Sequence, residues 1–262
     1  MKRAAIPLSP PPDPQGFYVG TSGWAYDAWQ PKFFPRDLPK SKFLPYYASR
    51  LTACEVNYTF RNRLKESTAQ KWIAETPASF RFVCKANQFI THMRRLKNCE
   101  DPIAIFAAGM EPLRKAKRLG CVLFQLPPNL KADPKLLRDF LKLLPRWMKA
   151  AFEFRDPSWF TDDTYEVLRR ARAALCIAET EALTSPEVQT APFLYYRFRR
   201  PDYTAAARRK LADRIRQART QADEIYVFFK HEERPESPLY ATELLHRVLP
   251  ESAPAIRQQQ TS

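Results

Sequence analysis

Long apolar runs and paired cysteines are both missing from this chain of 262 residues. No stretch approaches the roughly 20 apolar residues that a membrane-spanning helix needs. Five cysteines stand singly without a CxxC pair, which indicates neither a zinc knuckle nor a disulfide framework. Prolines follow the two basic residues near the start too early for a signal peptide. We therefore expect a cytoplasmic protein without a membrane partner.

Histidine is scarce, with three residues in the whole sequence. A multinuclear metal site needs several His, Asp and Glu ligands. The candidates here are few, namely Glu153, Glu179, His92 and His231. We therefore predict no metal site, and the sequence leaves any cofactor unknown.

Acidic residues are also in deficit, with 28 against 43 basic ones, and the formal net charge is +15. Such a charge attracts nucleic acid, an anionic surface or an acidic ligand. Much of the excess lies in helical patterns, at residues 114–118, at residues 169–172 and from residue 207 onward. In the last of these, Leu211, Ile215 and Ala218 form an apolar stripe that leaves the arginines on the solvent side. Solvated helices and a polyanion-binding surface both remain open.

The chain does contain eight short strand-like runs, mostly separated by helical patterns. They cover residues 17–22, 53–59, 80–85, 121–126, 150–155, 174–179, 193–199 and 225–231. Strands that alternate with helices favour a parallel sheet, and eight such units favour an α/β fold of the (β/α)8 TIM-barrel type. About a dozen residues separate the sixth and seventh runs, so the helix there is expected to be short or absent. Active sites of such barrels lie at the carboxyl ends of the strands.

Proline and polar residues mark the two ends of the domain. Residues 1–15 carry five prolines and are expected to form a disordered arm. The segment 250–262 is expected to be a disordered tail. Residues 16–249 are then a single TIM-barrel domain, because barrels of about 250 residues usually form one domain.

Polar residues inside the strand runs are expected to point toward the barrel axis, because a charge is costly in the helix layer. This rule places the following residues inside: Glu55, Asn57, Thr59, Arg81, Lys85, Gln125, Glu153, Arg155, Glu179, Arg197 and Lys230. Buried charges persist mainly when they are paired, so an internal ion-pair network is one interpretation. The other is a polar ligand at the mouth of the barrel.

Glu153 is the first candidate for a general acid or base. Phe152, Phe154 and Trp159 would desolvate its carboxyl and raise its pKa, whereas Arg155 would lower it. Arginine suits bidentate binding of carboxylate or phosphate, and a desolvated lysine can also form a Schiff base. Nothing in the sequence favours that covalent chemistry.

Two sets of candidate site residues follow. The catalytic candidates are Glu153, Lys85 and His92. Small hydroxyls in the glycine-flanked turn GTSGW, aromatics after strand ends and inward polar residues supply the substrate-binding candidates. These are Thr21, Ser22, Trp24, Asn57, Gln125, Arg155, Trp159, Arg197, Lys230 and His231. A tight turn, aromatic packing and hydrogen-bonded structural histidines are the competing explanations.

Seven segments together resemble the YecE-like family, known as domain of unknown function 72. They are GTSGW at Gly20, EVNYTF at Glu55, FRFVCKAN at Phe80, ITH at Ile90, LGCVLFQLPP at Leu119, FEFRDPSW at Phe152 and YVFFKHE at Tyr226. The resemblance covers about residues 17–249 and implies a TIM barrel, an intracellular location and no established reaction. Its architecture is similar to that of barrels that act on apurinic DNA or on sugars, which suggests a polar, phosphate-bearing substrate.

The chain departs from this family in two places. Arg197 is followed by Phe198, Arg199 and Arg200 where a histidine and a glycine are common. The segment RDPS precedes Trp159, where a histidine is common beside the arginine. Both changes remove imidazole from the expected mouth and disfavour a metal-dependent or histidine-based mechanism.

The leading functional hypothesis is an enzyme that binds an anionic or phosphorylated small molecule, with Glu153 as acid or base. A hydrolase, a lyase and an isomerase all remain open. One alternative is a nucleic-acid-binding protein, with or without phosphodiesterase or endonuclease activity, and another is a non-catalytic scaffold. The oligomeric state is not predicted.

Overall fold

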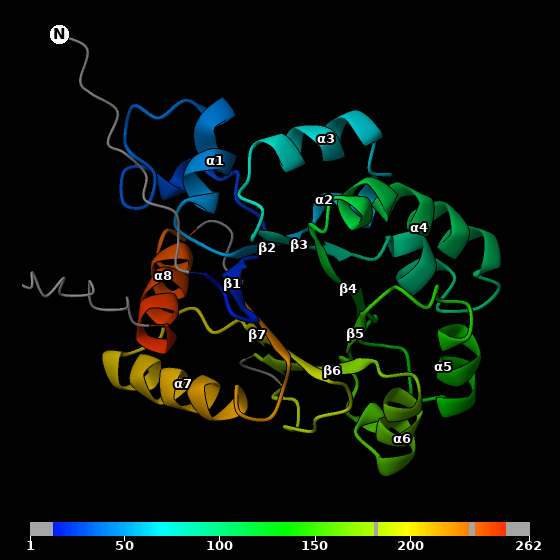
Figure 1. Ribbon diagram of the computed structural model, residues 1–262. Helices are drawn as coiled ribbons and strands as arrows, with labels where there is room; N and C mark the ends of the chain where they lie inside the picture. The colour runs from blue at the N-terminus through cyan, green and yellow to red at the C-terminus, as the bar shows by residue number, and fades with distance from the viewer. Residues whose placement is uncertain (1–12, 181–182, 231–233, 250–262) are drawn as a thin grey trace, which may run out of the picture.

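Eight parallel strands form the centre of the molecule, and helices surround them (Figure 1). The computed structural model describes residues 13–180, 183–230 and 234–249. Each strand pairs with its neighbours in the order β1-β8-β7-β6-β5-β4-β3-β2. The strands are β1 (Phe17–Thr21), β2 (Ala53–Val56), β3 (Arg81–Lys85), β4 (Leu119–Gln125), β5 (Ala150–Glu153), β6 (Ala174–Glu179), β7 (Phe193–Phe198) and β8 (Glu224–Phe229). The predicted (β/α)8 TIM barrel is confirmed.

The barrel closes between β1 and β2 through a few specific contacts instead of a full ladder. Ser22 and Glu55 form an isolated parallel bridge, and the N–H of Gly23 donates to the Glu55 carbonyl at 2.8 Å. The Tyr47 hydroxyl accepts from the Thr21 N–H at 2.7 Å and donates to the Ala53 carbonyl at 3.0 Å. A side chain therefore replaces ladder hydrogen bonds at this seam, and the strand ends on both sides are held together.

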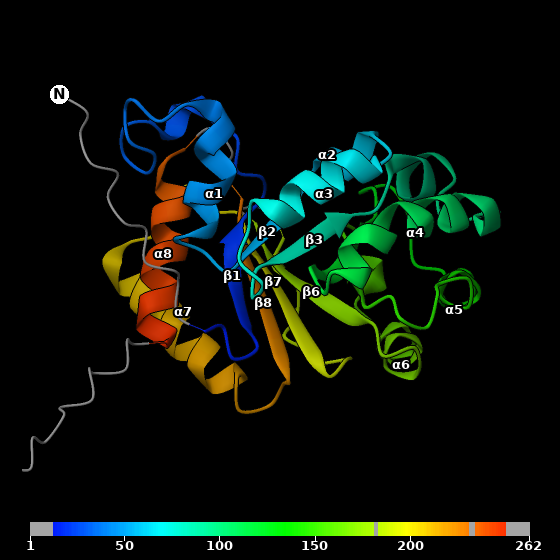
Figure 2. The same cartoon turned by 45° about the horizontal axis from the view of Figure 1, so that its top comes forward.

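The helices mostly follow the expected pattern. They are α1 (Phe43–Ala48), α2 (Tyr58–Arg61), α3 (Glu66–Ala74), α4 (Glu100–Lys115), α5 (Pro134–Leu141), α6 (Asp162–Arg170), α7 (Ala205–Ala218) and α8 (Glu236–Val248). Asp133 caps α5 by accepting from the Leu136 N–H at 2.9 Å, and proline begins that helix. Leu137 and Phe140 then bury one face of this helix. Figure 2 shows the helices packed around the outside of the strands.

The second strand ends earlier than its residue pattern predicts. The run 53–59 was expected to be one strand, but β2 ends at Val56 and the short helix α2 follows it. The Thr59 hydroxyl consequently lies on a helix, where it contacts the Lys85 carbonyl at 2.7 Å. Thr59 therefore supports the end of β3 instead of extending the inward face of β2.

The segment between β6 and β7 is irregular, as expected. Residue 180 and residues 183–192, the described part of this connection, form no helix. Side chains of the segment bond to the strand instead: Thr190 accepts from the Leu175 N–H at 2.8 Å and Ser185 from the Ala178 N–H at 3.2 Å. These bonds satisfy two backbone N–H groups of β6 in the unit that lacks a covering helix.

Exposed arginines of the helices pair with carboxylates nearby. Arg170 bonds Glu166 on α6 at 2.7 Å, and Arg208 of α7 bonds Glu243 of α8 at 2.6 Å. Such pairs support the interpretation of these helices as solvated surfaces. No helix in the described ranges is both long and apolar enough to cross a membrane. The predicted tail and most of the predicted arm lie outside the described residues.

Candidate functional site

Strand residues alternate between the helix layer and the barrel interior, and the interior changes from apolar to polar along the strands. Buried residues such as Val83, Ala151, Tyr195 and Phe228 form an inner apolar cluster. Two residues further along each of these strands come charged side chains: Lys85, Glu153, Arg197 and Lys230. The predicted inward polar layer thus lies above an apolar floor, at the carboxyl ends of the strands.

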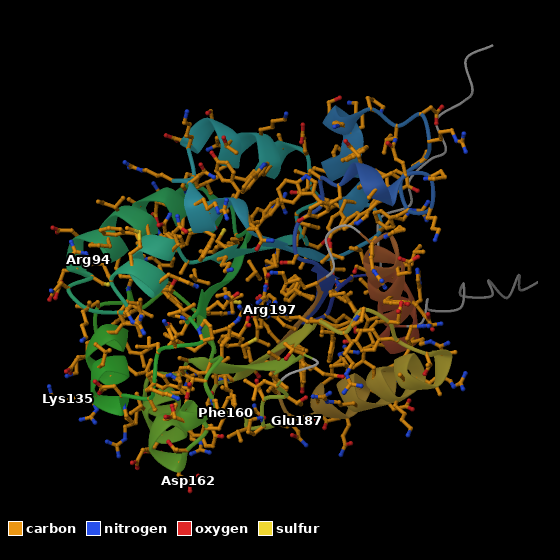
Figure 3. The ribbon with its side chains drawn as sticks, turned by 180° about the vertical axis from the view of Figure 1, so that it is seen from behind. Arg94, Lys135, Phe160, Asp162, Glu187 and Arg197 are labelled. Carbon is orange, nitrogen blue, oxygen red and sulfur yellow. The ribbon has the colours of Figure 1, made fainter. Side chains whose placement is uncertain are left out.

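Arg197 of β7 lies at the centre of this layer, with none of its surface exposed. Its guanidinium donates to Glu55 Oε1 on β2 at 2.5 Å and to Glu153 on β5. It also donates to the Gln125 side-chain oxygen on β4 at 3.3 Å. Figure 3 shows Arg197 near the middle of the molecule, whereas the labelled Lys135 and Asp162 lie toward its edge. One arginine therefore connects β2, β4, β5 and β7.

Glu55 is fully buried and accepts from three side chains. Besides Arg197, these are the Ser22 hydroxyl at 2.5 Å and the Tyr195 hydroxyl at 2.5 Å. Burial raises the pKa of Glu55, but Arg197 and the two hydroxyls outweigh burial and lower it overall. Asn57 extends the group by donating to the Ser22 hydroxyl at 3.2 Å. Sequence reasoning missed Tyr195, although its place two residues before Arg197 put it on the same inward face.

Burial and nearby arginines have opposite effects on the pKa of Glu153, as expected, and the arginines outweigh burial. Phe152 and Phe154 belong to the core between strands and helices and do not share the inward face of Glu153. Burial does raise the pKa of Glu153, but Arg197, Arg155 and Arg199 together lower it to about 2. Glu153 therefore stays a carboxylate near neutral pH and anchors guanidinium groups.

Two of those guanidiniums converge on a single carboxylate oxygen. Arg155 donates to Glu153 Oε1 at 3.1 Å, and Arg199 donates to the same oxygen at 3.3 Å. Their side chains are 28% and 22% exposed, so both reach from the buried layer toward solvent. Arg199 is absent from the sequence-based site, although it follows Arg197 by two residues on the same face.

Lys85 ends β3 inside the barrel and is 6% exposed. Its ammonium lies 3.9 Å from the centre of the Phe60 ring, in a cation–π contact. Within the described ranges the ammonium makes no hydrogen bond or ion pair. Burial, then Arg197 and Lys230, lower the pKa of Lys85 to about 7, against the opposing effect of Glu55 and Glu153.

His92 contacts the same phenylalanine. It belongs to a π-helical turn, η3 (Phe89–Met93), and its ring meets the Phe60 ring edge-on with centres 5.1 Å apart. Its Nδ1 lies 2.8 Å from the Thr91 hydroxyl. Burial, followed by Lys85 and Arg155, lowers the pKa of His92 and favours the neutral imidazole. The structure thus brings Lys85, Phe60 and His92 together at one side of the mouth.

Three expected ligand-binding residues lie outside the mouth. Thr21 faces outward, with its hydroxyl 2.9 Å from the Tyr47 hydroxyl and 2.7 Å from the Gly23 carbonyl. Trp24 packs edge-on against Trp72 of α3 with ring centres 5.3 Å apart. Trp159 is fully buried, stacks on Phe154 at 4.6 Å and donates its indole N–H to the Leu130 carbonyl at 2.7 Å. These aromatic rings serve packing, as the competing explanation held.

Two of the few candidate metal ligands have other outcomes, and the expectation that Glu179 faces inward is wrong. Ala178 faces the barrel interior, so Glu179 beside it points the other way and pairs with Arg200. His231 lies outside the described residues. Among the residues that the structure describes, no three His, Cys, Asp or Glu side chains come together as a metal-binding group.

The family model for "Protein of unknown function DUF72" matches residues 18–261. This chain belongs to the DUF72 family. The UPF0759 protein YunF of Bacillus subtilis is 29% identical over 156 residues, or 57% of this chain and 54% of the relative. The UPF0759 protein YecE of Escherichia coli K12 is 28% identical over 144 residues, or 55% and 50%. The alignments span about half the length of these curated relatives.

Solved structures of the DUF72 family share the barrel. A DUF72 protein from Thermotoga maritima superposes with a TM-score of 0.79 at 25% identity, covering 87% of this chain and 97% of the other. One from Enterococcus faecalis superposes with a TM-score of 0.75 at 18% identity, covering 90% and 96%. SacUVDE, with a TM-score of 0.51 at 10% identity over 88% and 98% of the two chains, shows a common fold alone. The predicted family resemblance is confirmed.

Burial of the Lys85 ammonium in this DUF72 protein is expected to cost stability. We expect Lys85→Met to raise the free energy of unfolding at pH 6–7 by roughly 2 kcal/mol, because it removes a desolvated charge. The unfolded chain keeps the lysine proton up to its ordinary pKa of 10.5, whereas the folded protein loses it near 7. The gain should therefore shrink as pH rises from 7 toward 10. Urea unfolding across this pH range measures it.

The exposed Lys131, which pairs with Asp156 at 2.9 Å, provides a matched control. Lys131→Met should change the free energy of unfolding by less than about 1 kcal/mol at every pH. A Lys85→Met protein that is less stable than the parent at pH 6 would contradict the buried, unpaired ammonium.

Proposed function

We propose that this DUF72 protein is an enzyme that binds an anionic, phosphate-bearing substrate at the carboxyl-terminal mouth of its barrel. The observation that carries this proposal is an excess of positive charge on the inward faces of the strands and their ends. In the described part of the chain, five cations lie there against two carboxylates, Glu55 and Glu153. The cations are Lys85, Arg155, Arg197, Arg199 and Lys230.

The two carboxylates are already engaged by the buried arginine. Arg197 bonds to both of them, and Arg155 and Arg199 share a single oxygen of Glu153. Cations gathered in a partly desolvated site repel one another, which contributes to the lowered pKa of Lys85. An anion at the mouth would relieve this repulsion, and guanidinium groups match the geometry of phosphate and carboxylate oxygens.

Proton transfer in this site falls to residues other than Glu153. A general acid or base works best when its pKa lies near the working pH. Glu153 has a pKa of about 2, whereas Lys85 has a pKa of about 7 beside the neutral imidazole of His92. We therefore assign the acid–base role to Lys85, with His92 next to it, and the anchoring of the arginines to Glu153.

Anion affinity tests the proposal directly. We expect Arg155→Gln and Arg199→Gln each to weaken binding of inorganic phosphate or 2-phosphoglycolate by about tenfold, because a charge-assisted hydrogen bond contributes 1.5–3 kcal/mol. Titration calorimetry, with NMR chemical shifts for weak binding, measures this. Arg138→Gln, an exposed arginine on α5, removes the same charge outside the mouth and should leave affinity unchanged. Equal losses in all three variants, or no anion binding in the parent, would reject the proposal.

A polynucleotide is the second candidate for the phosphate-bearing ligand, and the net charge of +15 favours it. Counterion release then makes affinity fall steeply with salt, in proportion to the number of phosphates contacted. A single-stranded or duplex oligonucleotide titrated at several salt concentrations distinguishes the two. A steep slope that Arg138→Gln reduces as much as Arg155→Gln does would favour a broad polyanion surface over a small-molecule mouth.

A further inference from the structure

Among the described residues, Lys85 is set apart from the other charged residues of the mouth because its ammonium has no hydrogen-bond or ion-pair partner there. Buried lysines ordinarily pair with a carboxylate or accept a heavy desolvation cost. In the residues that the structure describes, the Lys85 ammonium makes no hydrogen bond or ion pair, and it lies 3.9 Å from the centre of the Phe60 ring. A purely structural lysine would be expected to pair with Glu55 or Glu153, yet Arg197 occupies both carboxylates.

The position of Lys85 is fixed from several sides. It is the last residue of β3, and the Thr59 hydroxyl donates to its carbonyl at 2.7 Å. Charged and titratable groups face its side chain from each surrounding element. They are Arg197 of β7, Lys230 after β8, Glu55 of β2, Glu153 of β5 and His92 of η3. Arg197 and Lys230 favour the unprotonated amine of Lys85, which is the form that attacks a carbonyl carbon.

We propose that Lys85 is a nucleophile that forms a covalent imine with the carbonyl group of a small anionic aldehyde or ketone. This inference rests on the proposed function, because the arginines of the mouth would bind the phosphate or carboxylate group of the same substrate. It adds the carbonyl group to the substrate class and a covalent step to the reaction. Such a lysine, desolvated and next to other cations, is a recognised form of activated amine.

The covalent step balances without a further reactant. The lone pair of Lys85 Nζ attacks the carbonyl carbon, and the C–N bond forms while the carbonyl oxygen takes up the proton that the nitrogen loses. The resulting carbinolamine loses its hydroxyl together with the remaining nitrogen proton as water, which leaves a neutral imine, and a proton taken up from solvent then gives the protonated imine. Water addition reverses the sequence and returns the free amine. His92, whose ring also contacts Phe60, is the nearby neutral base that can exchange these protons with solvent.

Borohydride trapping tests the inference, because reduction turns an imine into a stable secondary amine. Pyridoxal 5′-phosphate serves as the probe, since it joins an aldehyde to a phosphate, and 5′-deoxypyridoxal is the matched aldehyde without the phosphate, which also lacks the hydroxyl that would close onto the aldehyde. The full-length protein is incubated with each probe, reduced and digested, and the modified lysines are located by mass spectrometry. We expect modification of Lys85 ahead of all other lysines, at least tenfold faster with the phosphorylated probe.

Variants and pH separate a reactive site from general lysine labelling. Lys85→Arg keeps the positive charge but forms no imine, so the dominant product should disappear, whereas it should persist in Lys131→Arg. Labelling of Lys85 should rise with pH with a midpoint near 7, not near the ordinary 10.5 of lysine. Circular dichroism and urea unfolding of Lys85→Arg show whether the variant is folded.

The experiment tests the covalent reaction of Lys85 and the anion site separately. Phosphate binding without preferential labelling of Lys85 would overturn the inference and leave the anion site intact. Labelling of Lys85 that is equally fast with 5′-deoxypyridoxal, and that inorganic phosphate does not slow, would support the nucleophile and overturn the anion site. Labelling spread evenly over surface lysines, with a midpoint far above pH 7, would also overturn the inference.

Discussion

Replacing Arg197 with methionine is expected to lower the free energy of unfolding by about 3–5 kcal/mol. Methionine occupies a similar volume but leaves Glu55 and Glu153 as buried carboxylates without their central counter-ion. Both carboxylates are about 1% exposed or less, so solvent cannot replace the guanidinium. Urea denaturation at neutral pH, followed by tryptophan fluorescence, measures the loss.

A surface arginine that forms an ion pair is the matched comparison for Arg197→Met. Arg170 bonds Glu166 on the outside of α6 at 2.7 Å, with its side chain 78% exposed. Arg170→Met should cost less than about 1 kcal/mol, because exposed ion pairs contribute little. Removing the carboxylates together with the arginine, in the triple change Arg197→Met, Glu55→Gln and Glu153→Gln, should recover part of the lost stability. Equal effects of Arg197→Met and Arg170→Met would contradict the buried network.

A methyl group at Gly20 is expected to destabilise the protein by about 3 kcal/mol or more. A Cβ atom at this position would lie 1.8 Å from the Ala53 carbonyl oxygen and 2.6 Å from the Tyr47 hydroxyl. Both contacts belong to the seam where β1 and β2 close the barrel, so neither strand can move aside without breaking the hydrogen bonds of Tyr47. Thermal and urea unfolding of Gly20→Ala measure the effect.

A Gly→Ala change at Gly109, in the middle of α4, is expected to have the opposite effect on stability. A Cβ atom there would lie 3.5 Å from the Leu64 carbonyl oxygen, which is an ordinary contact. Gly109→Ala should therefore raise stability by about 0.5–1 kcal/mol through the better helix propensity of alanine. If the two alanine substitutions had similar effects, the close approach of β1 and β2 would be in doubt.

The alternation of residues along the strands predicted most of the buried layer correctly. Glu55, Gln125, Glu153 and Arg197 all face the barrel axis because successive side chains of a strand point to opposite sides. The same rule also places Tyr195 and Arg199 on the inward face, because each lies two residues from Arg197. The inward prediction failed for Glu179, which lies beside the inward Ala178 and pairs with Arg200. Thr21, Trp24 and Trp159 were chosen from a turn and from aromatics after strand ends, not by this rule, and they lie outside the mouth.

Charge states were the part of the site that local sequence did not predict. The aromatic neighbours of Glu153 in the chain face the helices, whereas Arg197 and Arg199 reach it from β7, more than 40 residues away in the sequence. Among the described residues, the Lys85 ammonium has no carboxylate partner, because Arg197 already bonds to Glu55 and Glu153. A pKa depends on which charges meet in space, and neighbours in sequence determine that poorly.

The sequence by itself determined the barrel, its eight strands, the irregular unit between the sixth and seventh strands, the family and the inward direction of most charged residues of the strands. Those properties follow from local periodicity and from the cost of placing charge in an apolar layer. Only the tertiary structure decided which carboxylates Arg197 occupies, that Glu153 is held ionised and that Lys85 is left against Phe60. These depend on distances between different strands, which are set when the barrel closes.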